Sequence, residues 1–291
     1  LPVNLDTKCL RTTQNHIAKA QRSDGAIPWE YGGKLDTWNH VEAAMGLTVM
    51  GMEAEARGAF DFLKRLQRAD GSWAAEYGPT NTPTQHHTNT NFTAYVATGI
   101  WHHALVTDDV SFLESHWQTV STALDFVLLH QESTGHILWA VNNQGVPYPD
   151  ALVSGCASIY LSLQCGVEIA RALGRSIHRW ERAREMLGQA LRSERNFDRT
   201  WPSKRRFAMD WFYPVLADVL SPETGLERLD ERWDEFAASK LGCRCVADQN
   251  WHTAAETAEL VIALVRAGAR AKAGEMYRTL NQFRADDGGF W

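Results

Sequence analysis

The chain has 291 residues, of which 44% are hydrophobic and 22% charged, and its formal net charge is −6. A chain of this length can build one large hydrophobic core, so residues 1–291 are predicted to form a single domain. The net negative charge and the lack of a basic cluster argue against a nucleic-acid partner. The sequence also contains no run of about 18 uncharged apolar residues, which is what a membrane-spanning helix would need.

The five cysteines are Cys9, Cys156, Cys165, Cys243 and Cys245. An odd and sparse set in a chain of this length argues against a disulfide framework. Cys243 and Cys245 have only one residue between them and no second pair nearby, which does not fit a zinc site. We therefore expect free thiols, a cytoplasmic protein, no metal and no cofactor.

Eleven helices are predicted from the spacing of apolar residues. In chain order they cover residues 5–20, 36–51, 54–67, 89–105, 109–130, 150–172, 177–193, 207–220, 225–240, 249–267 and 270–284. Some are amphipathic, as in 54–67, where Ala56, Phe60 and Leu63 share one face. Others are apolar or small nearly all round, as in 41–52, 92–105, 155–172 and 253–265. The second kind must be covered on all sides, so these helices are predicted to form an inner layer.

A short phrase recurs where helical patterns end. It is found at Gln21 to Trp29, Gln67 to Trp73 and Gln131 to Trp139, and a related form closes the chain at Arg284 to Trp291. Each copy places a glycine where a helix stops and then an aromatic residue, because glycine accepts the positive φ that ends a helix. The phrases are predicted to be turns whose aromatic residue packs back onto a helical hairpin.

Repeated hairpins of this kind predict an all-α ring, the (α/α)6-type toroid, in which each unit buries its apolar face against its neighbours. Six hairpins need twelve helices, and eleven are predicted. We expect the missing inner helix to follow Trp291, so that the chain stops one helix short of closure. An open ring, or five hairpins with a capping helix, is the alternative.

The residues of these phrases carry two resemblances. Gln67 to Trp73 resembles the repeat of squalene and related terpene cyclases and of protein prenyltransferase β subunits. Nearly the whole chain is similar to bacterial proteins described as prenyltransferase-like or squalene-cyclase-like. The stretch from Tyr95 to Trp139, including Trp101 to Leu105 and Gly135 to Trp139, is similar to the six-hairpin glycosidases such as glucoamylase. Both groups use the α/α toroid, so both resemblances imply this fold.

The chain departs from the first group in its chemistry. Terpene cyclases of this kind protonate their substrate with an Asp-x-Asp-Asp motif, which this sequence lacks, and the zinc-binding set of prenyltransferases has no match here. Glucoamylase-like enzymes need two carboxylates across the ring, and acidic candidates are present.

Polar residues cluster at the starts of the predicted inner helices, which would place them around one central cavity. We predict Asp36 and Asp210 as the catalytic pair, with Asp248 as the third candidate. Asp36 and His40 are four residues apart, as are Asp248 and His252, so each pair is expected on one helical face. The predicted substrate-binding residues are Trp38, Asn39, His40, Glu42, His87, Asn91, Asp150, Trp211, Tyr213, Trp251, His252 and Glu256.

The same residues have a structural interpretation. Aspartate at a helix start is a preferred N-cap, and large aromatic side chains are routine core filler. The sequence predicts a glycoside hydrolase that acts on an oligosaccharide or another small molecule. It leaves open an isoprenoid cyclase or prenyltransferase, and a ring without catalytic activity that binds a glycan or a protein.

Overall fold

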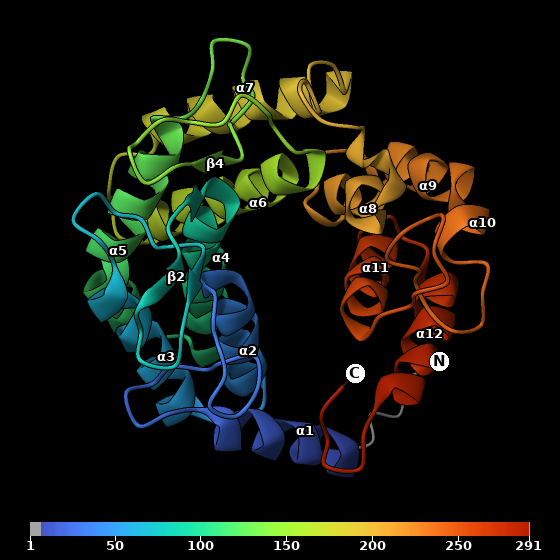
Figure 1. Ribbon diagram of the computed structural model, residues 1–291, viewed down its shortest axis with the longest axis horizontal. Helices are drawn as coiled ribbons and strands as arrows, with labels where there is room; N and C mark the ends of the chain where they lie inside the picture. Colours follow the sequence, from blue (N-terminus) through green and yellow to red (C-terminus); the bar gives the residue numbers. More distant parts are fainter. Residues whose placement is uncertain (1–6, 291) are drawn as a thin grey trace.

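The computed structural model describes residues 7–290, and its helices form two layers around a ring (Figure 1). Consecutive inner helices contact each other around the ring, and each of them also packs against an outer helix. The inner helices are α2 (Thr37–Val49), α4 (Thr90–Thr107), α6 (Val153–Ala172), α8 (Ala208–Leu216) and α11 (Ala254–Arg266). The outer helices are α1 (Thr7–Ala20), α3 (Glu53–Leu66), α5 (Val110–Leu128), α7 (His178–Ser193), α9 (Pro222–Glu231), α10 (Trp233–Phe236) and α12 (Arg270–Thr279), with 3-10 turns at Lys204–Arg206 and Leu280–Phe283. The predicted all-α toroid is confirmed.

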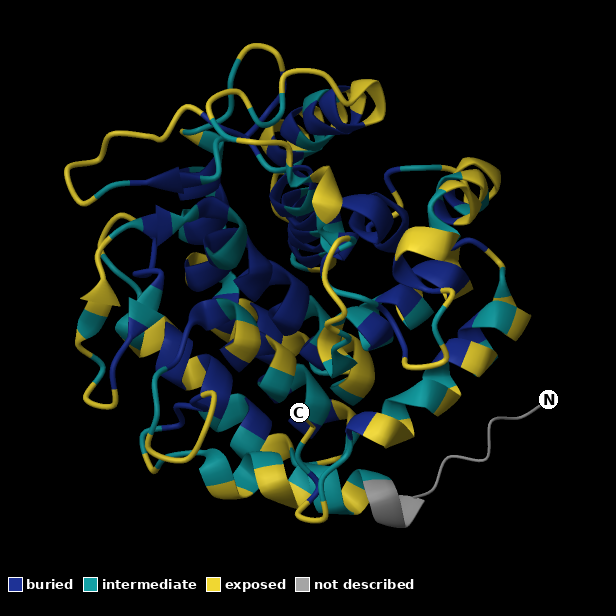
Figure 2. Ribbon diagram, turned by 45° about the vertical axis from the view of Figure 1, so that its right-hand side comes forward, coloured by how far each residue is buried: buried dark blue, intermediate teal, exposed yellow. Residues whose placement is uncertain are grey.

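Burial follows the two kinds of helical pattern. Figure 2 shows α4, α6 and α8 largely buried, while the outer helices alternate between buried and exposed faces. Helix α6 is long and apolar enough to cross a membrane, but 72% of its most apolar window is buried inside the protein. This burial is what a helix covered by neighbours on all sides requires.

Four short strands lie in the loops before the inner helices. Strand β1 (Glu76–Tyr77) pairs antiparallel with β2 (Pro83–Gln85), and β3 (Thr88–Asn89) pairs antiparallel with β4 (Ala140–Val141). In the second pair, Thr88 is opposite Val141 and Asn89 is opposite Ala140. The β3 and β4 pair joins the loop before α4 to the loop before α6.

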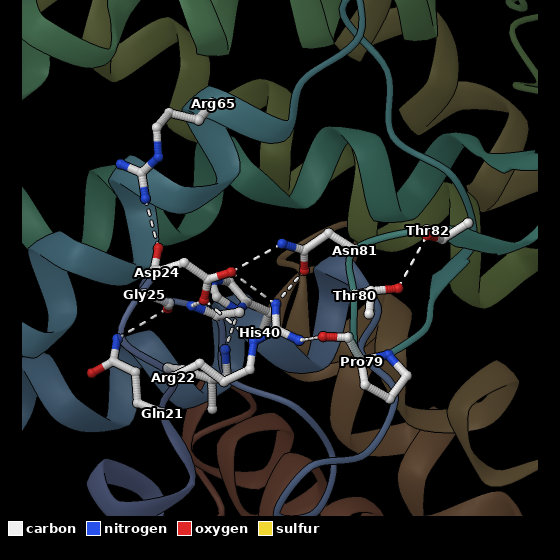
Figure 3. A network of polar contacts seen from close by, with 12 residues as sticks. Gln21, Arg22, Asp24, Gly25, His40, Arg65, Pro79, Thr80, Asn81 and Thr82 are labelled. Carbon is white, nitrogen blue, oxygen red and sulfur yellow. Dashed lines mark hydrogen bonds and ion pairs between the residues drawn. The ribbon is translucent and has the colours of Figure 1, made fainter.

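In the first three turn phrases, the glutamine side chain links two neighbouring outer helices through hydrogen bonds. In the first copy the Gln21 side-chain amide donates to the Gly25 carbonyl at 3.0 Å and to the Glu55 carbonyl on α3 at 2.9 Å. Figure 3 shows this turn, where Arg65 of α3 also donates to the Asp24 carbonyl. Gln67 and Gln131 repeat both contacts, and reach Thr119 on α5 and Ala183 on α7.

The glycine of each phrase lies directly against the next outer helix. Gly25, Gly71 and Gly135 have φ values of 92°, 91° and 91°, and a Cβ there would lie 2.1 to 2.3 Å from a helix carbonyl oxygen on α3, α5 or α7. Gly288 has a φ of 90° and lies against Thr12 of α1 in the same way. The last phrase therefore joins the end of the chain to its first helix, which closes the outer layer.

The inner layer is not closed in the same way. Within residues 7–290, no inner helix stands between α11 and α2. A cavity of about 600 Å³ lies in this interval, lined in part by Ile17 of α1, Ala43 of α2 and Ala258 of α11.

Two predicted helices have different bounds in the structure. The helix predicted over 225–240 is divided into α9 and α10, and α9 starts earlier because Ser221 caps it and Pro222 occupies its first turn. The helix predicted over 249–267 begins only at Ala254, because Thr253 is its N-cap. The residues from 249 to 253 are therefore outside the helix, and this changes the interpretation of the polar cluster there.

Candidate active site

Two glutamates and three aromatic side chains from four inner helices come together inside the ring. They are Trp38 and Glu42 of α2, Tyr95 of α4, Tyr213 of α8 and Glu259 of α11, and we call them the central cluster. Trp38 stacks on Tyr95 with ring centroids 3.9 Å apart and an interplanar angle of 13°, and it lies 5.9 Å from the Tyr213 ring. Tyr95 and Tyr213 are buried, so the rings form a fixed aromatic wall beside the two carboxyl groups.

The two carboxyl groups of the central cluster differ in their partners. The Tyr95 hydroxyl donates a hydrogen bond to Glu42 Oε1. Glu259 receives no such bond from the described residues, and its pKa is raised by desolvation and by the charges of Glu42 and Glu256. Desolvation also raises the pKa of Glu42, although the hydrogen bond from Tyr95 opposes that rise.

Glu42 is exposed to solvent and yet strongly desolvated by the protein around it. This combination is expected for a side chain that faces an accessible space enclosed by protein. Glu42 lines the cavity of about 600 Å³ between α2 and α11. Of the central cluster, Glu42 is therefore the residue that a small molecule in this cavity would meet.

The structure places Asp36 at the N-cap of α2, where its carboxylate is fully hydrogen-bonded. Asp36 Oδ1 accepts the Asn39 backbone N–H at 2.8 Å, and Oδ2 accepts the Asn39 side-chain amide at 2.8 Å and the Trp29 indole N–H at 2.7 Å. The side chain is 3% exposed. Asp36 thus caps α2 and also holds the Trp29 ring, and its catalytic role remains a prediction.

Asp210 is buried between α8 and the start of α6. Its Oδ1 accepts the Ser154 backbone N–H at 3.1 Å, and its Oδ2 has no hydrogen-bond partner among the described residues. Desolvation raises the pKa of Asp210 to about 6, against the hydrogen bond from Ser154. The carboxyl lines neither cavity near the central cluster, and its catalytic role also remains a prediction.

The raised pKa of Asp210 predicts a pH-dependent stability. The ordinary value is 3.8, so between about pH 4 and about 6 the unfolded chain loses this proton while the folded chain keeps it, and the fold loses stability as the pH rises. Asp210→Asn keeps the acceptor for Ser154 and does not ionise. We expect its stability relative to the wild type to improve by at most about 3 kcal/mol between pH 4 and pH 7, as measured by urea unfolding. A stability difference that does not vary with pH would contradict this.

The pairing predicted for Asp248 and His252 is wrong. These residues lie in the loop before α11, so a spacing of four does not put them on one helical face. Asp248 is exposed and forms an ion pair with Arg206 at 2.8 Å, and Trp251 is 56% exposed. His252 instead pairs with Arg244 through the backbone.

Three other predicted residues already have protein partners in the core. His40 is fully buried, accepts the Ile27 N–H at 3.0 Å and contacts the Ala59 carbonyl at 2.9 Å, so it holds the first turn phrase against α3. Trp211 is buried, donates to the Arg228 carbonyl at 2.9 Å and stacks on Phe236. Asp150 is buried and accepts from the Thr200 N–H and hydroxyl. These contacts give all three a structural role in the core, and their predicted role in substrate binding remains a prediction.

The remaining predicted residues lie near the starts of inner helices. Thr253, the N-cap of α11, accepts the Glu256 N–H at 3.3 Å and donates its hydroxyl to the Glu256 carboxylate, which also accepts from the Cys245 thiol at 3.0 Å. His87 is half-buried with its ring 5.7 Å from the Trp139 ring, Asn91 is half-buried beside α6, and Asn39 is exposed. Across residues 7–290, no three His, Cys, Asp or Glu side chains gather as metal ligands would.

Sequence reasoning missed Tyr95 and Glu259. It looked for polar residues at helix starts, but both lie at least one turn inside an inner helix. A signal was present for Glu259, because it is a charged residue within the apolar stretch 253–265. A carboxyl group in an inner helix needs a partner or a function.

A comparison with known proteins adds to this geometry. The chain is 41% identical over all 291 residues to the MMP endo-(1,4)-3-O-methyl-alpha-D-mannosidase of Mycolicibacterium hassiacum, and it spans 80% of that protein. No family model matches the chain.

Two solved structures share the fold. A novel alpha-amylase from Clostridium perfringens has a TM-score of 0.74 at 9% identity, with 100% of this chain and 93% of that one covered. A glycosidase variant in complex with glucose has a TM-score of 0.76 at 16% identity, with 97% and 84% covered. At these identities the likeness shows the fold alone.

The fold and the related mannosidase define this protein as a carbohydrate-active enzyme of the glycoside hydrolase class. Within that class, the chain belongs to the family of the MMP endo-(1,4)-3-O-methyl-alpha-D-mannosidase. None of the proteins compared above is a terpene cyclase or a prenyltransferase, so the isoprenoid alternative gains no support from them.

Proposed function

We propose that the protein hydrolyses internal α-(1,4) bonds in a saccharide of 3-O-methylmannose, with Glu42 and Glu259 as its catalytic carboxyl groups. The substrate follows from the related mannosidase, which matches this chain along its whole length. The pair of carboxyl groups beside an aromatic wall supports the mechanism, because most glycosidases use two carboxyl groups that flank the cleaved bond. The single observation that carries this assignment is that Glu42 lines a cavity inside the ring beside the aromatic wall, close enough to Glu259 for its charge to raise the pKa of that carboxyl.

The surroundings of the two carboxyl groups divide their roles. Among residues 7–290, no side chain or backbone group donates a hydrogen bond that would stabilise the charged form of Glu259, and Glu42 and Glu256 repel a negative charge there. It therefore keeps its proton and serves as the general acid that protonates the glycosidic oxygen. Glu42 accepts a hydrogen bond from Tyr95, which favours the ionised form needed in a base or a nucleophile.

The position of Glu42 relative to the anomeric carbon sets the stereochemical outcome. If its carboxylate reaches the carbon directly, it forms a glycosyl-enzyme intermediate and the configuration is retained. If a water molecule lies between them, Glu42 removes a proton from that water and the configuration is inverted. In both cases the aromatic wall of Trp38 and Tyr95 beside Glu42 would border a sugar ring next to the cleaved bond.

The substrate assignment is tested by incubating the protein with an α-(1,4)-linked oligosaccharide of 3-O-methylmannose, the same oligosaccharide without methyl groups, and an α-(1,4)-glucan oligosaccharide. We expect mass spectrometry to show shorter oligosaccharides from the methylated mannan, and a rate on the glucan that is lower by at least about a hundredfold. Proton NMR of the first products gives the anomeric outcome. Equal rates on all three saccharides would contradict the proposed specificity, and no cleavage of any would contradict hydrolysis.

The catalytic pair predicted from the sequence, Asp36 and Asp210, is tested in the same assay. If that pair were correct, Asp36→Asn and Asp210→Asn would each abolish turnover of the methylated mannan, while Glu42→Gln and Glu259→Gln would retain it. The assignment made here predicts that the glutamate variants lose the most activity.

A further inference from the structure

A second cavity lies beside the central cluster and plays no part in the chemistry proposed above. It has a volume of about 590 Å³ and lies between α1 and the loop that leads from the first turn phrase into α2. Its walls include Ile17 of α1, Trp29 and Tyr31 of the loop, and Asn39 and Ala43 of α2. Concave sites with apolar and aromatic walls and a few polar groups are where proteins bind small organic ligands.

Two large aromatic side chains are exposed in this cavity wall. Trp29 is 56% exposed and Tyr31 is 86% exposed, whereas the equivalent phrase residue Trp73 is 1% exposed. Trp29 therefore does not serve as the core anchor that Trp73 provides in its own phrase. An exposed aromatic wall of this kind is a common mark of a binding surface.

The Trp29 ring is held in position although it is exposed. Its indole N–H donates to Asp36 Oδ2 at 2.7 Å, and the same oxygen accepts the Asn39 amide. The Lys34 ammonium lies 4.4 Å from the Trp29 ring centroid and forms an ion pair with Glu76 at 2.6 Å. A ring fixed in this way loses little freedom when a ligand stacks on it, which favours binding.

The cavity adjoins the site proposed for catalysis. It shares Ile17 and Ala43 with the cavity that Glu42 lines. Asn39 and Ala43 are one helical turn apart on α2, and Glu42 follows Asn39 by three residues. A chain of linked sugars that has one bond at Glu42 could thus extend along α2 to Trp29.

We propose that this cavity is a saccharide subsite, in which Trp29 stacks on a sugar ring remote from the cleaved bond and Asp36 positions Trp29. The inference rests on the proposed function, because it takes the oligosaccharide as the ligand. The C–H face of a pyranose and a methyl ether are both apolar, and they suit the surface that Trp29, Ile17 and Ala43 offer. Asp36 is then a positioning residue that acts through the indole.

The experiment measures binding apart from turnover. An α-(1,4)-linked 3-O-methylmannose oligosaccharide is titrated calorimetrically into Glu259→Gln, alone and combined with Trp29→Ala. We expect Trp29→Ala to weaken binding by about tenfold, and Trp29→Phe, which keeps a ring, to weaken it less. Leu129→Ala changes an exposed apolar residue (71% exposed) at the end of α5 and serves as the control with unchanged affinity.

Steady-state kinetics separate the positioning role of Asp36 from a catalytic one. Asp36→Asn can still cap α2 through its oxygen, but the NH2 group that replaces Oδ2 can accept neither the Trp29 indole N–H nor the Asn39 side-chain amide. We expect KM to rise in Asp36→Asn and Trp29→Ala alike, with kcat changed by less than about threefold in each. A loss of kcat at constant KM in Asp36→Asn would overturn the positioning role, and unchanged affinity in Trp29→Ala would overturn the subsite.

Failure of the subsite and failure of the proposed function give different results. If the wild type cleaves the oligosaccharide and Trp29→Ala cleaves and binds it equally well, only the subsite is wrong. If the wild type cleaves no saccharide, the proposed function is wrong, and the calorimetric titration still reports whether binding depends on Trp29.

Discussion

Glu259→Gln is expected to lower kcat for saccharide hydrolysis by about two to four orders of magnitude without lowering the unfolding temperature. The reason is chemical, because an amide cannot deliver the proton that the leaving oxygen needs. The unfolding temperature should not fall because no hydrogen bond of the described residues depends on the Glu259 carboxyl, and because the amide is neutral without having to hold a proton that the unfolded chain releases. The assay is turnover of the methylated mannan, alongside thermal unfolding.

The pH profile gives the same assignment a second test. Because the pKa of Glu259 is raised well above its usual range, the acid keeps its proton to a higher pH than an ordinary glutamate does, and activity should fall on the alkaline side as it ionises. That alkaline limb should be lost in Glu259→Gln. Glu275→Gln changes an exposed glutamate on the outer helix α12 and is the matched control. Full activity in Glu259→Gln, or equal losses in the two variants, would exclude Glu259 as the acid.

The fold could be predicted from the sequence because two local signals agree. Helices that are apolar all round require a surrounding layer, and the recurring phrases mark where one hairpin ends and the next begins. The structure explains why the phrases recur. The glutamine of a phrase donates hydrogen bonds to the next outer helix, and its glycine lies directly against the backbone of that helix. Such contacts repeat around the ring, so the repeated sequence pattern was sufficient to predict the toroid.

The site was harder to predict because the same residue types cap helices and catalyse reactions. Asp36 is an N-cap, His40 is a core residue with two backbone partners, and Asp248 lies in an exposed ion pair. Sequence spacing cannot tell these environments apart, since burial depends on which helix lies opposite. Glu42 was selected because it follows a polar cluster, whereas Glu259 was missed because it lies inside an apolar stretch.

Aromatic residues illustrate the same limit. Trp211 and Tyr213 are two positions apart on α8 and both are buried, but they point in different directions around the helix axis. Trp211 packs outward onto Phe236, while Tyr213 approaches Trp38 in the central cluster. Both were predicted to contact substrate. Which of the two packs in the core and which belongs to the central cluster depends on the side of α8 that each side chain occupies.

Gly71→Ala is expected to destabilise the fold by several kcal/mol, well above the roughly 1–2 kcal/mol that a left-handed backbone conformation alone costs an alanine. Gly71 has a φ of 91°, and an added Cβ would lie 2.3 Å from the Thr122 carbonyl oxygen on α5, which is backbone and cannot move aside as a flexible side chain would. Relief would require separating the phrase from α5 and breaking the Gln67 contacts with Gly71 and Thr119.

Gly145→Ala separates the two contributions to this loss. Gly145 has a similar φ of 78°, but nothing lies within 4 Å of its Cβ position. Chemical unfolding of both variants should therefore give a loss of about 1–2 kcal/mol for Gly145→Ala and a distinctly larger one for Gly71→Ala. Equal losses would mean that backbone conformation alone explains the glycine. A larger loss for Gly71→Ala would show that the ring requires glycine at this position because the phrase and the next outer helix are in direct backbone contact.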